Sequence, residues 1–287
     1  MFAHCVPASI VHPFTDSVPE PPHPTSRNAA ASTVPATCTG TLTSRTFPSA
    51  AFAAQIMTQL REDVAVTART TTFLVDADDT LLDNDRIRDD LEHHLDREYG
   101  ADARAAYWAI QERRFVELGY RDYLGAVQEW WESERWDPRL LAVSEYLLEY
   151  PFADRLYPHA LDVLARLRDA GTTVVLTDGD AIFQPRKVSS AGLSSVVDGV
   201  LVYVHKEEEL DDVERRYPAE RYVLVDDKVR ILAAAKRHWG DRVTTVLPLQ
   251  GQFANDADLV AAHPSPDLTV NAVGDLLELD LQGLVRV

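Results

Sequence analysis

The chain has few cysteines, no excess of basic residues and no long apolar run. Its two cysteines, Cys5 and Cys38, precede the regularly patterned region, which therefore holds neither a disulfide nor a thiolate metal site. The formal charge of −18 argues against nucleic acid or an anionic membrane as a partner. No apolar stretch approaches the roughly 20 residues that span a bilayer. We therefore expect a cytoplasmic protein without nucleic-acid or membrane partners. A small anionic substrate is compatible with this net charge, because one or two local cations can bind it.

The N-terminal segment, residues 1–56, differs in composition from the rest of the chain. Proline, serine, threonine and alanine dominate it, and neither helical nor strand periodicity persists, so we expect disorder. It lacks the basic start and apolar run of a signal peptide. Met57 opens the segment that leads into the first strand, so one hypothesis is that the native protein begins there.

From Thr70 onward, short β-branched runs alternate with helical stretches such as 160–170 and 229–238. This alternation predicts an α/β protein with a Rossmann-like, doubly wound and mostly parallel sheet. The expected strands are 72–75, 172–176, 200–204, 222–225, 243–247 and, less distinctly, 268–270.

Between residues 83 and 157 the alternation stops, and only amphipathic helical patterns occur. We interpret this interval as an all-helical cap inserted into a core domain formed by 70–82 and 158–287. The expected helices are 87–99, 101–118, 120–132 and 138–148.

The first predicted strand ends in two carboxylates, Asp76 and Asp78, followed by Thr80. Carboxyl ends of strands in open α/β sheets form the binding sites of such folds, and oxygen ligands suit Mg²⁺. A solvated acidic turn is the alternative for this motif taken alone.

The second predicted strand ends in Thr177, Asp178 and Gly179, a hydroxyl followed by a glycine-containing turn. Such a turn offers a hydroxyl and backbone N–H groups to an anionic substrate. Lys206 follows the third strand, and Lys187 is its rival as the phosphate-binding lysine. We favour Lys206 because it comes after a strand, whereas Lys187 falls in the helix after the second motif.

The fourth predicted strand ends in the acidic pair Asp226 and Asp227. Each strand-end motif is weak by itself, but the set occurs in a fixed order on one edge of the sheet. This order resembles the haloacid dehalogenase (HAD) superfamily, with the motifs Asp-x-Asp-x-Thr, Ser/Thr, Lys/Arg and a terminal acidic pair. The similarity covers Thr70 to the C-terminus, and a helical cap between the first two motifs is one of the superfamily's standard arrangements. The chain most resembles a phosphatase-like branch with such a cap. Asp79 stands where many relatives have glycine, which reaches left-handed backbone angles more easily.

The resemblance implies a hydrolase in which Asp76 is the nucleophile and forms an aspartyl phosphate. Asp78 would protonate the leaving alkoxide and later deprotonate the attacking water. Thr177 and Lys206 would hold the phosphoryl oxygens.

The same resemblance implies a Mg²⁺ site. The side chains of Asp76 and Asp226 and the backbone carbonyl of Asp78 would bind the ion, with Asp227 assisting. We thus expect a Mg²⁺-dependent phosphatase that acts on a small phosphorylated metabolite. The identity of that substrate and the oligomeric state have no readable signal in the sequence.

Other functions remain as alternatives. A 2-haloacid dehalogenase needs the nucleophile but neither a metal nor a leaving-group acid, so Asp78 and the acidic pair favour phosphoryl chemistry. Phosphonate hydrolysis and a non-catalytic phospho-binding module are further alternatives. In a receiver-like module the acidic pair follows the first strand, which differs from the order here.

Overall fold

The computed structural model describes residues 70–134 and 136–284. The N-terminal segment predicted to be disordered, residues 1–56, and Met57 lie outside the described residues. In the described part, no helix combines the length and the apolar composition needed to cross a membrane. The strands are β1 (Thr71–Val75), β2 (Thr172–Asp178), β3 (Gly199–Tyr203), β4 (Arg221–Val225), β5 (Val243–Pro248) and β6 (Leu268–Val270).

Helices connect the strands. The α-helices are α2 (Asn84–Tyr99), α3 (Ala101–Leu118), α4 (Tyr123–Ser133), α5 (Leu141–Glu149), α6 (Ala160–Ala170), α7 (Phe183–Ser190), α8 (Leu210–Arg216), α9 (Val229–Trp239), α10 (Gly251–Asn255), α11 (Ala257–Ala261) and α12 (Leu281–Leu284). The 3-10 helices are η1 (Pro138–Leu140), η2 (Phe152–Arg155), η3 (Leu193–Ser195), η4 (Lys206–Glu208), η5 (Gly240–Arg242) and η6 (Val273–Leu277).

The strands form one six-stranded sheet in the order β3-β2-β1-β4-β5-β6, and every pairing is parallel. The predicted α/β fold class is therefore confirmed. β1 lies between β2 and β4, with Thr72 opposite both Thr172 and Tyr222. Because the order reverses beside β1, the carboxyl ends of β1, β2 and β4 meet at a topological switch point, where open α/β sheets bind ligands.

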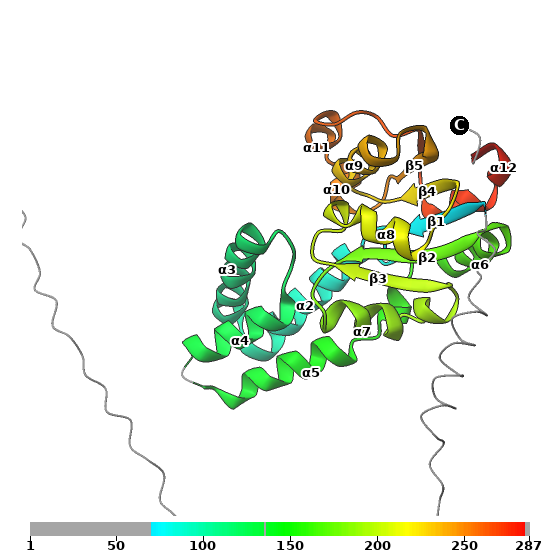
Figure 1. Ribbon diagram of the computed structural model, residues 1–287. Helices are drawn as coiled ribbons and strands as arrows, with labels where there is room; N and C mark the ends of the chain where they lie inside the picture. The colour runs from blue at the N-terminus through cyan, green and yellow to red at the C-terminus, as the bar shows by residue number, and fades with distance from the viewer. Residues whose placement is uncertain (1–69, 135, 285–287) are drawn as a thin grey trace, which may run out of the picture. The chain divides into compact units, whose positions relative to one another are not determined.

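Helices cover both faces of the sheet (Figure 1). In β1 the side chain of Phe73 belongs to a core cluster with α6 and α7, whereas Leu74 belongs to a second cluster with α8 and α9. Successive residues of a strand point to opposite faces, so a strand covered on both sides needs a continuous apolar run. This explains why the strands of this chain do not alternate between apolar and polar residues.

The segment between β1 and α6 contains α2, α3, α4 and α5 with the short η1 and η2, and no strand among its described residues. Figure 1 shows these helices grouped beyond the carboxyl ends of the central strands. The chain leaves and re-enters the core through two adjacent connections: Asp83 donates its N–H to the Arg155 carbonyl, and Tyr157 donates to Leu81. Arg155 also pairs with Asp90 of α2 at 2.7 Å, which ties the helical segment to its own exit.

Asp79 adopts a left-handed backbone conformation with φ 59°, at the position where the resemblance favours glycine. Its carboxylate oxygen accepts the N–H groups of Asn84 and Asp85 at 3.0 and 3.2 Å, which fixes the start of α2. The buried Asp79 side chain leaves no room at Gly251, where an added Cβ would lie 2.4 Å from the Asp79 Cβ. The Asp79 side chain can therefore occupy this position only because residue 251 is a glycine.

We expect Gly251→Ala to destabilise the protein more than Gly192→Ala. Both glycines have positive φ, but an added Cβ at Gly192 meets no atom within 4 Å. Backbone strain costs about 1 kcal/mol at either position, and the collision with Asp79 adds about 1–3 kcal/mol at Gly251. Urea unfolding measures both losses.

The same measurement in an Asp79→Gly background isolates the collision. There the extra cost of Gly251→Ala should vanish, while the cost of Gly192→Ala should stay the same. An extra cost at Gly251 that persists without the Asp79 side chain would contradict this explanation.

Candidate active site

The parallel ladders continue past the strand ends and place the acidic motifs side by side. The N–H of Asp76 donates to the Val225 carbonyl at 2.9 Å, and the N–H of Asp226 donates to Val246 at 3.1 Å. Asp76, Asp226 and Asp227 are buried, and one carboxylate oxygen of each lies within 4.8 Å of the others. The fold thus brings together three acids that are far apart in the sequence.

Lys206 lies at the centre of this site. Its Nζ is 2.6 Å from Asp76 Oδ1 and 2.7 Å from Asp226 Oδ2, and it donates to the Leu176 carbonyl at 3.1 Å. The side chain is fully buried. Burial alone would lower the pKa of Lys206, but the carboxylates of Asp226 and Asp76 outweigh it and raise the pKa above its ordinary value. Lys206 is therefore a permanent cation between two acids.

Burial disfavours the charged forms of Asp226 and Asp227. Burial raises the pKa of Asp226 even though Lys206 opposes the rise, and burial raises the pKa of Asp227 well above its usual range. Lys228 contributes a second cation whose own pKa is raised: burial opposes the rise, and Asp227 is its main cause. Two lysines thus offset part of the negative charge.

The donor set fits a hard divalent cation. Asp76 Oδ2 and both carboxylate oxygens of Asp227 are buried and accept no hydrogen bond from any residue that the structure describes. Buried carboxylate oxygens normally have partners, and oxygen atoms are the ligands that Mg²⁺ prefers. The backbone carbonyl of Asp78 remains a predicted ligand, and the Asp78 side chain pairs with a different lysine, Lys187.

Asp78 is held by α7. Its carboxylate lies 2.8 and 2.9 Å from Lys187 Nζ, which also donates to Asn84 Oδ1 at 3.0 Å. Gln184 Nε2 is 3.3 Å from Asp78 Oδ2 and 2.9 Å from Thr177 Oγ1. Lys187 and Gln184 are both buried, so they fix the direction of the carboxylate and of the threonine hydroxyl.

The remaining predicted substrate contacts, Asp178 and Gly179, lie at the end of β2. Asp178 Oδ1 accepts the N–H of Lys206 at 2.8 Å, which joins the second and third motifs. The N–H of Gly179 donates to the Tyr203 carbonyl at 2.8 Å, so it is already used within the fold. Both residues line the cavity described next.

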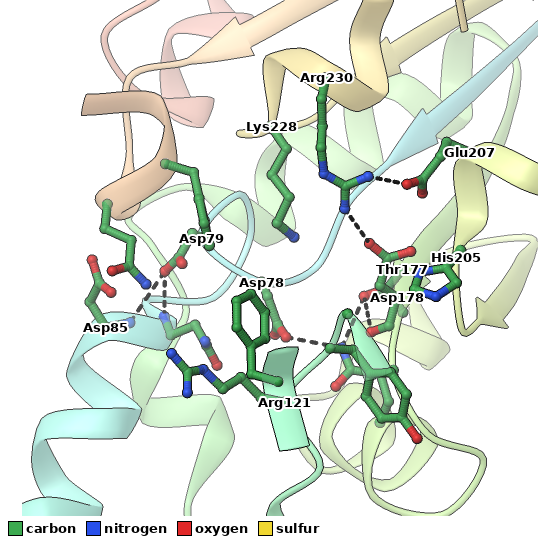
Figure 2. Close-up of a pocket in the computed structure, with 18 of the residues that line it drawn as sticks. Asp78, Asp79, Asp85, Arg121, Thr177, Asp178, His205, Glu207, Lys228 and Arg230 are labelled. Atoms are coloured by element: carbon green, nitrogen blue, oxygen red, sulfur yellow. Dashed lines mark hydrogen bonds and ion pairs between the residues drawn. The ribbon is translucent and has the colours of Figure 1, made fainter. Parts of the chain in front are cut away.

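A cavity of about 510 Å³ opens between this strand edge, the helical segment and α10. Figure 2 shows Lys228 reaching toward Asp78, with Asp79 and Asp85 on one side and Thr177 and Asp178 on the other. Burial, with Asp85 and Asp78 nearby, raises the pKa of Asp79 to about 7. The lining includes Asp78, Asp79, Arg88, Phe115, Arg121, Tyr123, Thr177, Lys187, Lys228, Gln252 and Phe253.

Sequence reasoning missed part of this arrangement. Lys187 was expected on the helix after the second motif, and it does lie in α7, but its ammonium reaches Asp78. Gln184, one turn earlier on the same face of α7, gave no signal by itself. The position of Lys228 directly after the acidic pair was a signal that the motif comparison did not use.

The comparisons with known proteins agree with the motifs. The family model for haloacid dehalogenase-like hydrolases matches residues 70–238. A solved structure from Burkholderia xenovorans LB400, described as a haloacid dehalogenase-like hydrolase, is 52% identical, with a TM-score of 0.71, and the alignment covers 74% of this chain and 99% of that one. No curated protein matches the chain.

More distant structures share the fold alone. The HAD-hydrolase YfnB of Bacillus subtilis, solved with bound magnesium, is 17% identical with a TM-score of 0.52, covering 73% of this chain and 98% of that one. An L-2-haloacid dehalogenase from Xanthobacter autotrophicus, solved with covalently bound chloropropionic acid, is 18% identical with a TM-score of 0.51, covering 74% and 98%.

We expect Lys206→Met to destabilise the metal-free protein by about 3–5 kcal/mol, because it leaves two buried acids without their cation. The loss should be larger at pH 8 than at pH 5, since removal of Lys206 raises the pKa of Asp226 further and the folded variant binds an extra proton there as the pH falls. Urea unfolding in EDTA measures it.

Lys187→Met is the matched control. Its partner Asp78 is 22% exposed and can be hydrated, so the expected loss is only about 1 kcal/mol. Equal losses for the two lysines, or a Lys206→Met loss independent of pH, would refute the central electrostatic role of Lys206.

Proposed function

Because the chain belongs to the haloacid dehalogenase-like hydrolases, we propose that it is a Mg²⁺-dependent phosphatase of small phosphorylated metabolites. The observation that carries this proposal is the buried group of Asp76, Asp226 and Asp227, with three oxygens that accept no hydrogen bond from the described residues. Dehalogenation through a nucleophilic carboxylate needs neither a metal nor a leaving-group acid, so three clustered buried acids favour phosphoryl transfer. Phosphoryl transfer uses them to hold a cation.

In this proposal Asp76 attacks phosphorus, and the bond to the leaving oxygen breaks as the aspartyl phosphate forms. Lys206, 2.6 Å from Asp76, reduces the repulsion between that carboxylate and the approaching phosphoryl oxygens. Bound Mg²⁺, held by Asp76, Asp226, the Asp78 carbonyl and Asp227, would neutralise charge on the transferred group. The hydroxyl of Thr177, positioned by Gln184, is available to a phosphoryl oxygen.

Asp78 moves the protons. It donates one to the leaving alkoxide and later accepts one from the water that attacks the phosphorus of the intermediate, which releases phosphate and restores Asp76. Lys187 and Gln184 hold the Asp78 carboxylate on the cavity wall and are positioning residues for it. The helical segment, as a cap, would close over the site and exclude water before the first step.

Asp76→Asn should lower phosphate release from an aryl phosphate and a panel of metabolite phosphates by at least about 1,000-fold, because the nucleophile is lost. Wild-type release should require Mg²⁺ and stop in EDTA. Asp162→Asn is the matched control, since this exposed α6 residue pairs with the exposed His159.

Chloride release from 2-chloropropionate, measured in parallel, distinguishes dehalogenase activity from phosphatase activity. We expect none. Metal-independent chloride release without phosphate release would replace the phosphatase proposal by dehalogenation. Substantial phosphate release by Asp76→Asn would remove Asp76 as the nucleophile.

A further inference from the structure

The cavity contains a second group of cations, away from the lysines of the strand edge. Arg88 projects from α2 and Arg121 from the connection between α3 and α4, and both line the same cavity as Asp78 and Thr177. Figure 2 shows Arg121 across the cavity from Lys228. Neither arginine takes part in the chemistry proposed above, so each needs its own explanation.

Arg88 is incompletely partnered. Its Nε is buried and donates no hydrogen bond to any described residue, and its Nη1 reaches only the Gln252 side-chain oxygen at 3.4 Å. Burial raises the pKa of Asp85, and Arg88 opposes the rise, so the two charges are near each other. Within the described part of the chain, however, Arg88 has no carboxylate at ion-pairing distance. A guanidinium that faces a cavity with unused donors is suited to an anion.

Arg121 is bound only weakly to its neighbours. It pairs at 2.8 Å with Glu112, whose side chain is 62% exposed, and its guanidinium lies 4.5 Å from the centre of the Phe115 ring. An ion pair with so exposed a partner contributes little, so a ligand can replace it. Contact with the ring of Phe115, which lines the same cavity, holds the guanidinium at the cavity wall.

Tyr123 lines the same cavity as the two arginines and Asp78. Burial is the main cause that raises the pKa of this tyrosine; Asp78 adds to the rise, while Arg121 and Arg88 oppose it. The charges of Asp78 and of both arginines therefore act on the same buried tyrosine. Both arginines belong to the helical segment, so they line the cavity on the side away from the strand edge.

We propose that the leaving group of the substrate carries a second anionic group, a carboxylate or a further phosphate, which Arg88 and Arg121 bind. The aromatic side chains of Phe115 and Phe253, which line the same cavity, would contact the chain between the two anions. This inference rests on the proposed phosphatase function, because it assumes that a phosphoryl group occupies the strand edge.

Phosphonates that cannot be hydrolysed test the inference without turnover. The probes are ω-carboxyalkylphosphonates with two to four carbons, alkylphosphonates of the same lengths, and α,ω-bisphosphonates, titrated calorimetrically into the full-length protein with Mg²⁺. At the best length, wild type should bind a doubly anionic probe at least about tenfold more tightly than the alkylphosphonate, as expected for one charge-assisted hydrogen-bond pair. Whether the carboxylate or the bisphosphonate binds more tightly identifies the anion.

Arg88→Gln and Arg121→Gln should each reduce this affinity ratio to below about threefold. Arg88→Lys should retain part of it, which shows that a Gln variant failed through charge and not through folding. Arg97→Gln is the control on the same helix, because Arg97 is exposed and pairs with its neighbour Glu98.

A wild-type ratio near one at every probe length, or an unchanged ratio in Arg88→Gln, overturns the inference. The outcome is separate from the phosphatase proposal. Phosphate release without a preference for doubly anionic probes refutes only the second anion site, and a preference without phosphate release refutes only the proposed reaction.

Discussion

The buried ammonium of Lys206 is the constraint on which the rest of the site depends. It holds Asp76 and Asp226, which follow neighbouring strands, at 2.6 and 2.7 Å. Without it, two desolvated carboxylates would repel each other at the centre of the sheet edge. The parallel order β2-β1-β4 brings the acids together. Lys206, which follows β3, offsets the repulsion between them. The strand order thus places the two carboxylates close together, and the Lys206 ammonium offsets their repulsion.

The fold could be predicted from the sequence because strands buried on both faces have an unmistakable composition. Helix α6 occupies the predicted residues 160–170, and α3 the predicted 101–118. The observed helix boundaries differ from the predicted ones where an N-cap residue, and not the apolar periodicity, determines the first residue of the helix. Asp83 accepts the Arg86 N–H, so α2 begins at Asn84 instead of residue 87.

The site was predictable only where a motif follows a strand directly. The acids and Lys206 met this condition, and the structure places them together, while their individual roles stay predictions. Lys187 did not meet it, because its reach to Asp78 depends on how α7 packs against the start of α2. The contribution of α10 was equally hidden. Gly251 leaves room for the side chain of Asp79, which is far from it in the sequence.

The overall charge of −18 does not describe the cavity, whose lining carries both acids and cations. Exposed charges farther away than a Debye length of about 8 Å are largely screened, so a substrate inside the cavity is affected mainly by its lining. Lys187 and Lys228 compensate acids that the proposed chemistry needs, and they leave little attraction for a distant part of the substrate. Arg88 and Arg121 have no such task. If they bind a second anion, selectivity comes from the helical segment while the reaction stays at the strand edge, and the two can vary independently in sequence.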